Sequence, residues 1–473
     1  MKTIHSILWV IAERCGGQGV FQLSLIVLAR FVSPEDYGTI ALVSIITTIL
    51  NVIVDSGLST ALIQKLEVDE EDFSTVFYTN LFLCTLLYII VFFAAPYIAT
   101  FYNDPKIAPV IRVLSVSIII VSITNVQIAY ISRNMLFKTY FFASLFGSLI
   151  AAIVAIIMAV KGYGIWTLVA LYLLNSAIDT IFLWIWVKWR PQLKFSFKKL
   201  AKLYKFGWKI FVASILDTVI SKIRQLLIGR YYTKDSLAYY EKGNDFACTP
   251  IYTISSSVNQ VLFPQLSVLQ NDQKEFKRVC KETMSFSAFS IFPLYAFTYI
   301  LAKPIILVLL GSSWINTVQY FELFCFYFCF YPLQSVNLVA TKAMGRSDIH
   351  LRVEIFRKIG DLIIVFLTYK YGPYYLALGV AAFQPISFFI TALPIKKLIN
   401  YGFIEQMLDV LPHGILTISL VLIANQMNNY INNAALLYIS QILIILTGYI
   451  IVNLIFKSKN LKVCKDFLLN KVK

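Results

Sequence analysis

Charged residues are scarce in this chain, and histidine is scarcer still. Only 14% of the 473 residues are Asp, Glu, Lys or Arg, and the three histidines, His5, His350 and His413, lie far apart. With 59% hydrophobic residues and a mean hydropathy of +0.74, the composition excludes a soluble globular protein of this length. Because no histidine has neighbours suited to a metal or catalytic site, we expect neither kind of site.

Motifs for nucleotide binding and room for an extramembrane domain are also missing. The chain has no Gly-x-x-x-x-Gly-Lys-Ser/Thr loop, which argues against direct ATP hydrolysis. Its seven cysteines include no Cys-x-x-Cys pair, so neither a disulfide framework nor a zinc site is expected. The connections between hydrophobic segments are too short for a folded domain, so any activity belongs to the membrane part. We therefore expect no catalytic residues, no metal and no cofactor, and leave coupling to H⁺ or Na⁺ open.

Long uncharged segments predict membrane-spanning helices, since roughly 20 helical residues cross about 30 Å of hydrocarbon. These segments are continuously apolar, which favours helices over the alternating strands of a barrel. The prediction is an all-α integral membrane protein with about fourteen transmembrane helices. Their centres fall near residues 18, 50, 87, 121, 150, 176, 217, 254, 295, 329, 363, 384, 418 and 445.

Basic clusters set the expected orientation. Lysine and arginine gather at 188–205, 274–281, 342–358 and 457–473. By the positive-inside rule these segments are cytoplasmic, which places both termini in the cytoplasm. The same rule, together with anionic lipid beside the protein, accounts for most of the net charge of +16, so nucleic-acid binding is not expected. The first apolar segment lacks a cleavage site and is expected to stay as an anchor.

Two similar stretches, 200 residues apart, indicate an internal duplication. Arg30 and Arg230 each follow an apolar run, and in register Ala29 matches Gly229 and Glu35 matches Asp235. Duplicated halves are common in transporters that open alternately to the two sides of a membrane. We predict two six-helix lobes with a terminal helix pair. The expected limits are an N-lobe at 1–189, a basic linker at 190–203, a C-lobe at 204–400, and the helix pair with its basic tail at 401–473.

Ionisable residues within the predicted spans are the candidate site, because such groups are costly in hydrocarbon and should face a polar interior. Helix one holds Glu13 and Arg14, and Arg14, Gln18 and Gln22 share one face. The alternative is a structural Glu-Arg contact with neighbouring helices. Helix two carries Asp55 at the end of a polar stripe, for which interhelical hydrogen bonding is the alternative.

The second copy offers matching groups. Helix seven places Asp217, Ser221 and Arg224 on one face, with Lys222 nearby, although Asp217 and Arg224 could equally pair with each other. Arg30 and Arg230 precede helix starts at the outer ends of helices one and seven. They either hold a phosphate leaving the cavity or fix the hairpin at the interface. Weaker candidates are Asp179 beside Asn175, Asp245, and Asp361 with Arg357 and Lys358.

These residues also carry a family resemblance. The stretches 28–38 (LARFVSPEDYG) and 55–64 (DSGLSTALIQ) resemble the amino-terminal signature of the polysaccharide transporters, Wzx-type flippases of the multidrug/oligosaccharidyl-lipid/polysaccharide superfamily. Further stretches, 263–267 (FPQLS) and 343–348 (AMGRSD), are similar to later parts of its colanic- and teichuronic-acid exporter branch. The resemblance covers nearly the whole chain.

The resemblance implies a flippase that moves an undecaprenyl-pyrophosphate-linked oligosaccharide across the membrane by alternating access. Arg14, Lys222 and Arg224 then become candidates for the anionic group, with Gln18, Arg30 and Arg230 beside them. Glu13, Asp55 and Asp217 become candidates for ion coupling. Implied partners are the lipid-linked oligosaccharide, membrane lipids and other polysaccharide-assembly proteins. The alternatives are a drug antiporter of the same superfamily and, less favoured because the loops are short, a membrane glycan polymerase.

Overall fold

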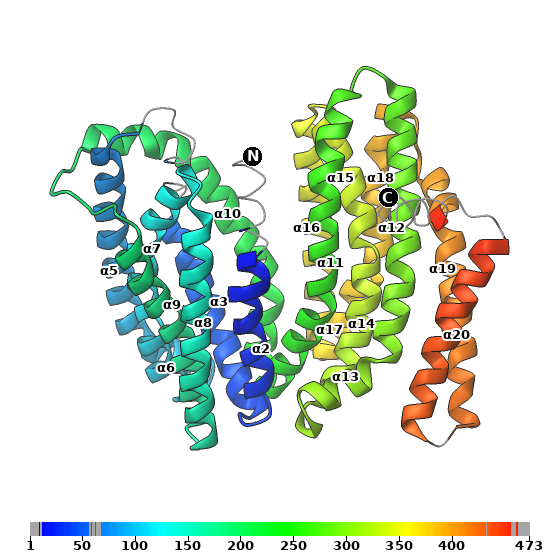
Figure 1. Ribbon diagram of the computed structural model, residues 1–473, viewed down its shortest axis with the longest axis horizontal. Helices are drawn as coiled ribbons and strands as arrows, with labels where there is room; N and C mark the ends of the chain where they lie inside the picture. Colours follow the sequence, from blue (N-terminus) through cyan, green and yellow to red (C-terminus); the bar gives the residue numbers. More distant parts are fainter. Residues whose placement is uncertain are drawn as a thin grey trace. The chain divides into compact units, whose positions relative to one another are not determined.

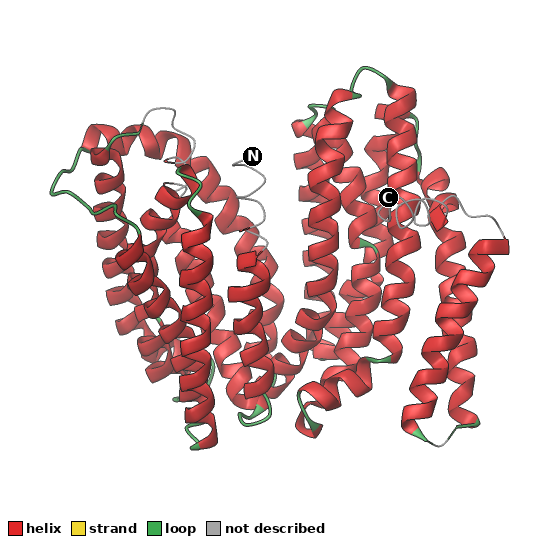
Figure 2. Ribbon diagram, viewed as in Figure 1, coloured by secondary structure: helices red, strands yellow, loops and turns green. Residues whose placement is uncertain are grey.

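The computed structural model describes residues 9, 12–55, 58, 62, 68–431, 433–455 and 460–461. Within this part the chain is helical and contains no strand (Figure 2). All fourteen predicted helix centres lie in helices, so the prediction of an all-α membrane protein is confirmed. The first centre, near residue 18, falls in a π-helix, η1 (Arg14–Gln18), which leads directly into α2 (Gly19–Leu28).

The chain forms two compact units, coloured along the sequence in Figure 1. Unit 1 comprises Met1–Ala238 and Leu309–Ser313, and unit 2 comprises Tyr239–Val308 and Trp314–Lys473. The lobe limits expected from the duplication stay a prediction. The two compact units reflect how the chain packs, and packing does not test whether two parts of the sequence are copies of each other. The main helices of unit 1 after α2 are α3 (Pro34–Asp55), α5 (Glu70–Phe101), α6 (Ile107–Leu114), α7 (Val116–Arg133), α8 (Phe137–Val160), α9 (Ile165–Trp186) and α10 (Phe197–Tyr231).

Helix α11 (Lys234–Val268) begins in unit 1 and runs on into unit 2. Two predicted spans of unit 2 are each broken in the middle. Phe330 separates α14 from α15 and Phe383 separates α17 from α18, each followed two residues later by a proline, which cannot donate a backbone hydrogen bond. The remaining helices are α12 (Gln273–Ile300), α13 (Ala302–Leu309), α14 (Thr317–Cys329), α15 (Tyr331–Ala343), α16 (Ser347–Thr368), α17 (Pro373–Ala382), α18 (Gln384–Ile399), α19 (Phe403–Gln426) and α20 (Ala434–Ile455).

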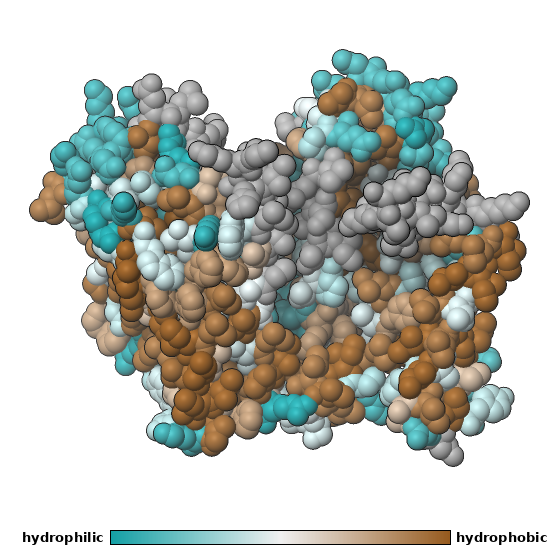
Figure 3. Space-filling view, viewed as in Figure 1, coloured by the Kyte–Doolittle hydropathy of each residue, from teal (hydrophilic) through white to brown (hydrophobic). Residues whose placement is uncertain are grey.

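Nine helices among the described residues are long and apolar enough to cross a membrane, or ten if the bent pair α12 and α13 is one span. Hydrophobic residues cover the sides of the helices in each unit and hydrophilic residues gather at their ends, as Figure 3 shows. Helix α16, the weakest predicted span, does not meet this hydropathy test. Its 22 residues nevertheless reach about 33 Å, which is enough to cross a bilayer.

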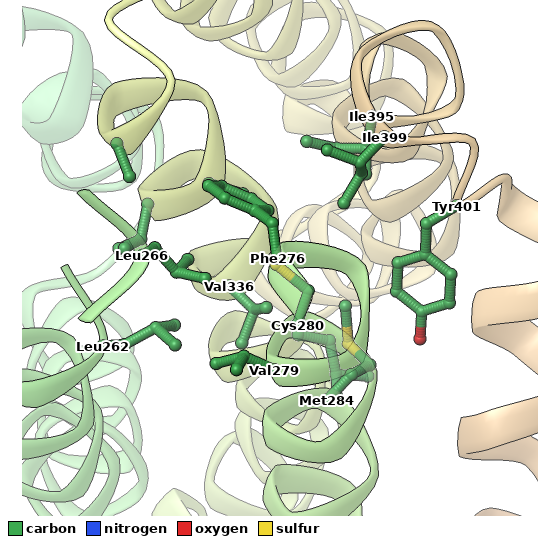
Figure 4. Packing of buried hydrophobic residues seen from close by; sticks show 14 of the residues in the cluster. Leu262, Leu266, Phe276, Val279, Cys280, Met284, Val336, Ile395, Ile399 and Tyr401 are labelled. Atoms are coloured by element: carbon green, nitrogen blue, oxygen red, sulfur yellow. The ribbon is translucent and has the colours of Figure 1, made fainter. Parts of the chain in front are cut away.

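Each unit has its own buried core. In unit 1, Phe73 and Phe77 of α5 pack with Ala143 of α8, Leu183 of α9 and Trp189. The unit 2 core joins α11, α12, α15, α18 and α19, with Phe276 and Met284 of α12 at its centre (Figure 4). A second cluster, including Ala424 and Ile445, ties the terminal pair α19 and α20 to α12. The predicted helical hairpin at the end of the chain is therefore present and packed.

The two repeated stretches touch each other inside unit 1. Glycine at position 38 of α3 is required because a Cβ there would collide with the backbone carbonyl of Lys234, and a Cβ at Gly229 of α10 would collide with Leu42. The Lys234 ammonium group also forms an ion pair with the buried Asp104 carboxylate. The two similar stretches thus pack backbone against backbone at Gly38 and Lys234.

Candidate functional site in unit 1

The polar start of helix one is wound more loosely than an α-helix. Residues Arg14–Gln18 form one π turn, a feature often found at functional sites because it re-aims side chains. Glu13 is 5% exposed, whereas Arg14, Gln18 and Gln22 are exposed. That the face shared by these three residues points into a polar interior stays a prediction. The Gln18 amide donates to both Glu13 carboxylate oxygens, at 3.2 and 3.3 Å.

Three glycines allow close packing around this turn. A Cβ at Gly17 would collide with the Ser144 hydroxyl of α8, and one at Gly16 would come within 2.8 Å of the Phe141 ring. On the same helix α8, a Cβ at Gly147 would collide with the Asp179 carboxyl group of α9. Small residues let membrane helices approach closely enough for their polar groups to meet. Here they bring polar groups of η1, α8 and α9 together.

Two carboxyl groups lie against the same stretch of α8, Glu13 at Ser144 and Asp179 at Gly147. The Ser144 hydroxyl donates to Glu13 Oε1 at 3.3 Å, and Asn175 Nδ2 donates to Asp179 Oδ2 at 3.2 Å. Ser148, one helical turn after Ser144, places its hydroxyl 3.0 Å from Asn175 Oδ1. Because Glu13 and Asp179 lie beside neighbouring residues of α8, their charges would repel each other if both were ionised. We call Glu13, Ser144, Ser148, Asn175 and Asp179 the carboxyl cluster.

One oxygen atom of the carboxyl cluster lacks a hydrogen-bond partner among the described residues. Asp179 Oδ1 is buried and has no hydrogen-bond partner in the described part of the chain. A buried carboxylate oxygen without a donor is costly if charged, and two nearby carboxylates raise that cost. A proton on Asp179 would remove this cost. Among the described residues, this cluster included, no group of three or more His, Cys, Asp or Glu side chains is placed to hold a metal ion.

Sequence reasoning placed Glu13 among the candidates but gave Asp179 little weight. Serines at 144 and 148 and the pair Asn175 and Asp179 each lie four residues apart, which puts each pair on one helix face. That spacing was a usable signal. It did not reveal that the two faces meet, because the meeting depends on the glycines that allow α8 to approach η1 and α9.

Arg30 and Arg230 each have a partner within unit 1. Arg30 Nε donates to the Leu309 carbonyl at 3.3 Å, and the Arg230 guanidinium lies 4.5 Å from the centre of the Phe101 ring. These contacts suit the interpretation that the two arginines fix the helix ends. A role in holding phosphate remains a prediction for both.

The remaining candidates are only partly described. Lys222 and Arg224 are half-buried on α10. Asp55 and Asp217 have a helical backbone, but their side chains lie outside the described residues. The Thr48 hydroxyl of the helix-two stripe donates to the carbonyl of Ser44 at 2.6 Å, so part of that stripe is satisfied by its own helix. Convergence of all these charges on one chamber stays a prediction.

Comparison with known proteins identifies relatives along most of the chain. A family model described as polysaccharide biosynthesis protein matches residues 27–319. The succinoglycan biosynthesis transport protein ExoT of Rhizobium meliloti (strain 1021) is 25% identical over 314 residues, which is 66% of this chain and 64% of ExoT. The chain thus matches somewhat less than two thirds of ExoT's length. The lipopolysaccharide biosynthesis protein WzxC of Escherichia coli (strain K12) is 20% identical over 75% of this chain and 73% of WzxC.

Solved structures show the same fold. The lipid II flippase MurJ in an inward closed conformation matches with a TM-score of 0.77 and 18% identity, over 95% of this chain and 98% of MurJ. An inward-facing multidrug transporter of the MATE family matches with a TM-score of 0.63 and 13% identity, over 83% of this chain and 98% of that one. Identities this low establish the shared fold and nothing about what is carried.

Proposed function

Because the chain belongs to the polysaccharide biosynthesis protein family, we propose that it is a flippase for a lipid-linked oligosaccharide. The proposed substrate is a polysaccharide repeat unit on undecaprenyl pyrophosphate, which crosses from the cytoplasmic to the outer leaflet. One observation carries this proposal. The family match runs from helix α2 to α14, and the same helices take part in a fold shared with the lipid II flippase MurJ over 95% of this chain. The protein is a transporter and not an enzyme.

The physical task of such a protein is to move a charged, hydrated head group while the lipid tail stays in the bilayer. A pyrophosphate needs cationic donors along its path, and Arg14, Lys222 and Arg224 are our candidates. Arg14 and Gln18 are exposed on one face of η1, so both are accessible to a ligand. Alternating access of the two predicted lobes would carry the head group from one side to the other.

We assign ion coupling to the carboxyl cluster. Glu13 was a candidate from the sequence, and the unpartnered Oδ1 of Asp179 supplies the second group. A proton or a sodium ion would relieve the repulsion between the two carboxylates, and its release would restore it. Asp55 and Asp217 stay candidates from the sequence alone. The protein would work in the bacterial cytoplasmic membrane with both termini inside, together with other polysaccharide-assembly proteins.

A host strain that lacks its own exporter of this family tests the proposal. With the gene, surface polysaccharide should return. Without it, lipid-linked repeat units should accumulate in the inner leaflet, measurable by mass spectrometry of extracted lipids. The MATE-like fold makes a drug antiporter the competing function. Unchanged glycans in the deletion strain, with increased sensitivity to cationic drugs, would favour that competitor and contradict the flippase.

A further inference from the structure

The segment that joins α9 to α10 has an unusual charge balance. Residues 180–216 contain no Asp or Glu and eight basic residues: Lys188, Arg190, Lys194, Lys198, Lys199, Lys202, Lys205 and Lys209. The part of this segment that joins the two helices follows Trp186, where the membrane-spanning helix α9 ends. It therefore starts at the boundary between the hydrocarbon and the water.

This segment is held firmly against the start of α5. Trp189 is 4% exposed, and its ring nitrogen donates to Glu70 Oε2 at 2.7 Å. The backbone N–H of Gln192 donates to the Ser74 hydroxyl at 3.0 Å, and that of Ser196 donates to the Thr75 hydroxyl at 3.1 Å. Because both hydroxyls lie in the second turn of a membrane-spanning helix, the segment stays at the level of the membrane surface.

Hydrophobic side chains project outward from this fixed backbone. Leu193 is 97% exposed and Phe197 is 79% exposed. The Phe195 and Phe197 rings contact each other edge to face, with their centres 4.8 Å apart. Along the first turns of α10, Phe197 and Tyr204 share an exposed face, while Leu203 is buried in the core of unit 1. A leucine and a phenylalanine this exposed at a membrane boundary indicate contact with lipid.

The exposed lysines beside these side chains have free ammonium groups. Lys188, Lys194, Lys198 and Lys202 are exposed and form no ion pair within the described part of the chain. The nearby carboxylates of Asp69 and Glu71 pair with another lysine, since Lys199 Nζ lies 2.5 Å from both Asp69 Oδ2 and Glu71 Oε2. The Arg190 guanidinium is not available either, because it donates to the carbonyls of Val187 and Trp189. The four lysines thus present positive charge that no acidic group of the described residues neutralises.

We propose that residues 188–204 form an interfacial anchor that binds anionic phospholipid of the cytoplasmic leaflet. Lys194, Lys198 and Lys202 contact the phosphate groups, while Leu193 and Phe197 insert below them. Three observations carry this: the level fixed by the contacts with α5, the exposed hydrophobic side chains, and the unpaired charge. Basic residues flanking hydrophobic ones are the pattern of segments that lie in the plane of an anionic membrane surface. The anchor holds this end of unit 1 at a defined depth, whatever substrate the protein carries.

Lipid binding by the full-length protein tests the charged part of the anchor. Native mass spectrometry of the purified chain with phosphatidylglycerol and with phosphatidylcholine would compare wild type with Lys194→Gln/Lys198→Gln/Lys202→Gln. We expect about tenfold weaker binding of phosphatidylglycerol in the triple variant and no change for phosphatidylcholine. A matched control removes three other exposed lysines, Lys274→Gln/Lys396→Gln/Lys397→Gln. Equal loss in the control, or no loss in the test variant, would overturn the proposal.

Insertion of the hydrophobic side chains needs a separate measurement. Leu193→Cys carrying an environment-sensitive fluorophore should shift to shorter wavelength in phosphatidylglycerol vesicles, and spin-labelled lipid should quench it. Unsubstituted protein labelled in parallel corrects for the native cysteines. A fluorophore that stays fully accessible to aqueous iodide in these vesicles would contradict insertion. Such a result would leave this hydrophobic surface to a protein partner instead.

Discussion

Gly147 on α8 leaves the space that the Asp179 carboxyl group of α9 occupies. The two helices pack so closely there that any side chain at position 147 would displace the carboxyl group. Nearby on α8, Ser144 donates to Glu13, and Ser148 donates to Asn175, whose amide donates to Asp179. A helix contact made possible by one missing side chain thus determines the geometry of the carboxyl cluster.

The first prediction follows from this contact. Gly147→Ala should reduce polysaccharide export at least about tenfold and destabilise the protein by about 1–3 kcal/mol, because the added methyl group overpacks the helix contact. Export and thermal unfolding in detergent are the two measurements. Gly19→Ala is the matched control, since its Cβ would meet only the Arg14 carbonyl, at 3.9 Å. Normal export by Gly147→Ala would show that the position of Asp179 is unimportant.

The second prediction concerns ion coupling. Asp179→Asn keeps the shape and the hydrogen bond with Asn175 but removes a group that can exchange a proton. Transport by the purified protein in vesicles should lose its stimulation by a proton or sodium gradient. Asp348→Asn, at an exposed position on α16, should leave that stimulation unchanged. Full gradient dependence in Asp179→Asn would remove the carboxyl cluster from the coupling mechanism.

The third prediction concerns a polar network in unit 2. Arg357 Nε donates to the Ser387 hydroxyl and Nη2 to Gln334 Oε1, both at 2.9 Å, while Nη1 lies 3.0 Å from Glu354 Oε1. Lysine cannot reproduce this fork of donors, so Arg357→Lys should lower the free energy of unfolding by about 1–3 kcal/mol. Arg352→Lys, exposed on the same helix, serves as the control. An unchanged melting temperature for Arg357→Lys would mean that the network adds nothing to stability.

The fourth prediction uses the ion pair between Lys234 and Asp104. Asp104 is 6% exposed, so Lys234→Met would leave a buried carboxylate without its cation and cost about 3–5 kcal/mol. The double variant Lys234→Met/Asp104→Asn should recover a large part of this loss, because the buried charge is gone. Chemical denaturation of wild type, the two single variants and the double variant measures the interaction free energy between the two side chains. Simple additivity of the two single effects would rule out a direct interaction.

The fifth prediction is a dependence of stability on pH at the anchor. Lys199 beside Asp69 lowers the pKa of this exposed carboxyl group from 3.8 to about 2. A carboxyl group whose pKa is lower in the folded state than in the unfolded state stabilises the protein at pH values above its unfolded-state pKa. This stabilisation is lost as the pH falls through the folded-state pKa. Stability should therefore fall between about pH 4 and pH 2. The difference between wild type and Lys199→Met should shrink across the same window, as thermal melts would show. A difference that stays constant would contradict the pairing.

The sequence was sufficient to predict the helices, because most of the spans are long apolar runs whose length the bilayer sets. It also predicted that Arg14, Gln18 and Gln22 share one polar face, whereas the contact between Gln18 and the buried Glu13 appears only in the structure. The contact between Ser144 and Glu13 could not be predicted, since 131 residues separate them and the contact depends on how η1 packs on α8. Likewise, Arg30 and Arg230 were recognisable as a repeated pair. Their partners, Leu309 and Phe101, are distant in sequence and follow only from the packing.

Transbilayer movement of a lipid-linked oligosaccharide tests the proposed function most directly. The purified protein would be placed in vesicles with an undecaprenyl-pyrophosphate oligosaccharide that carries a fluorophore on its sugar, and a membrane-impermeant reductant would report which leaflet holds it. We predict that wild-type protein exposes nearly all of the fluorophore to the reductant, while Arg14→Ala slows this exchange at least about tenfold. Exposure of only the outer half of the lipid, equal to that in protein-free vesicles, would contradict the flippase.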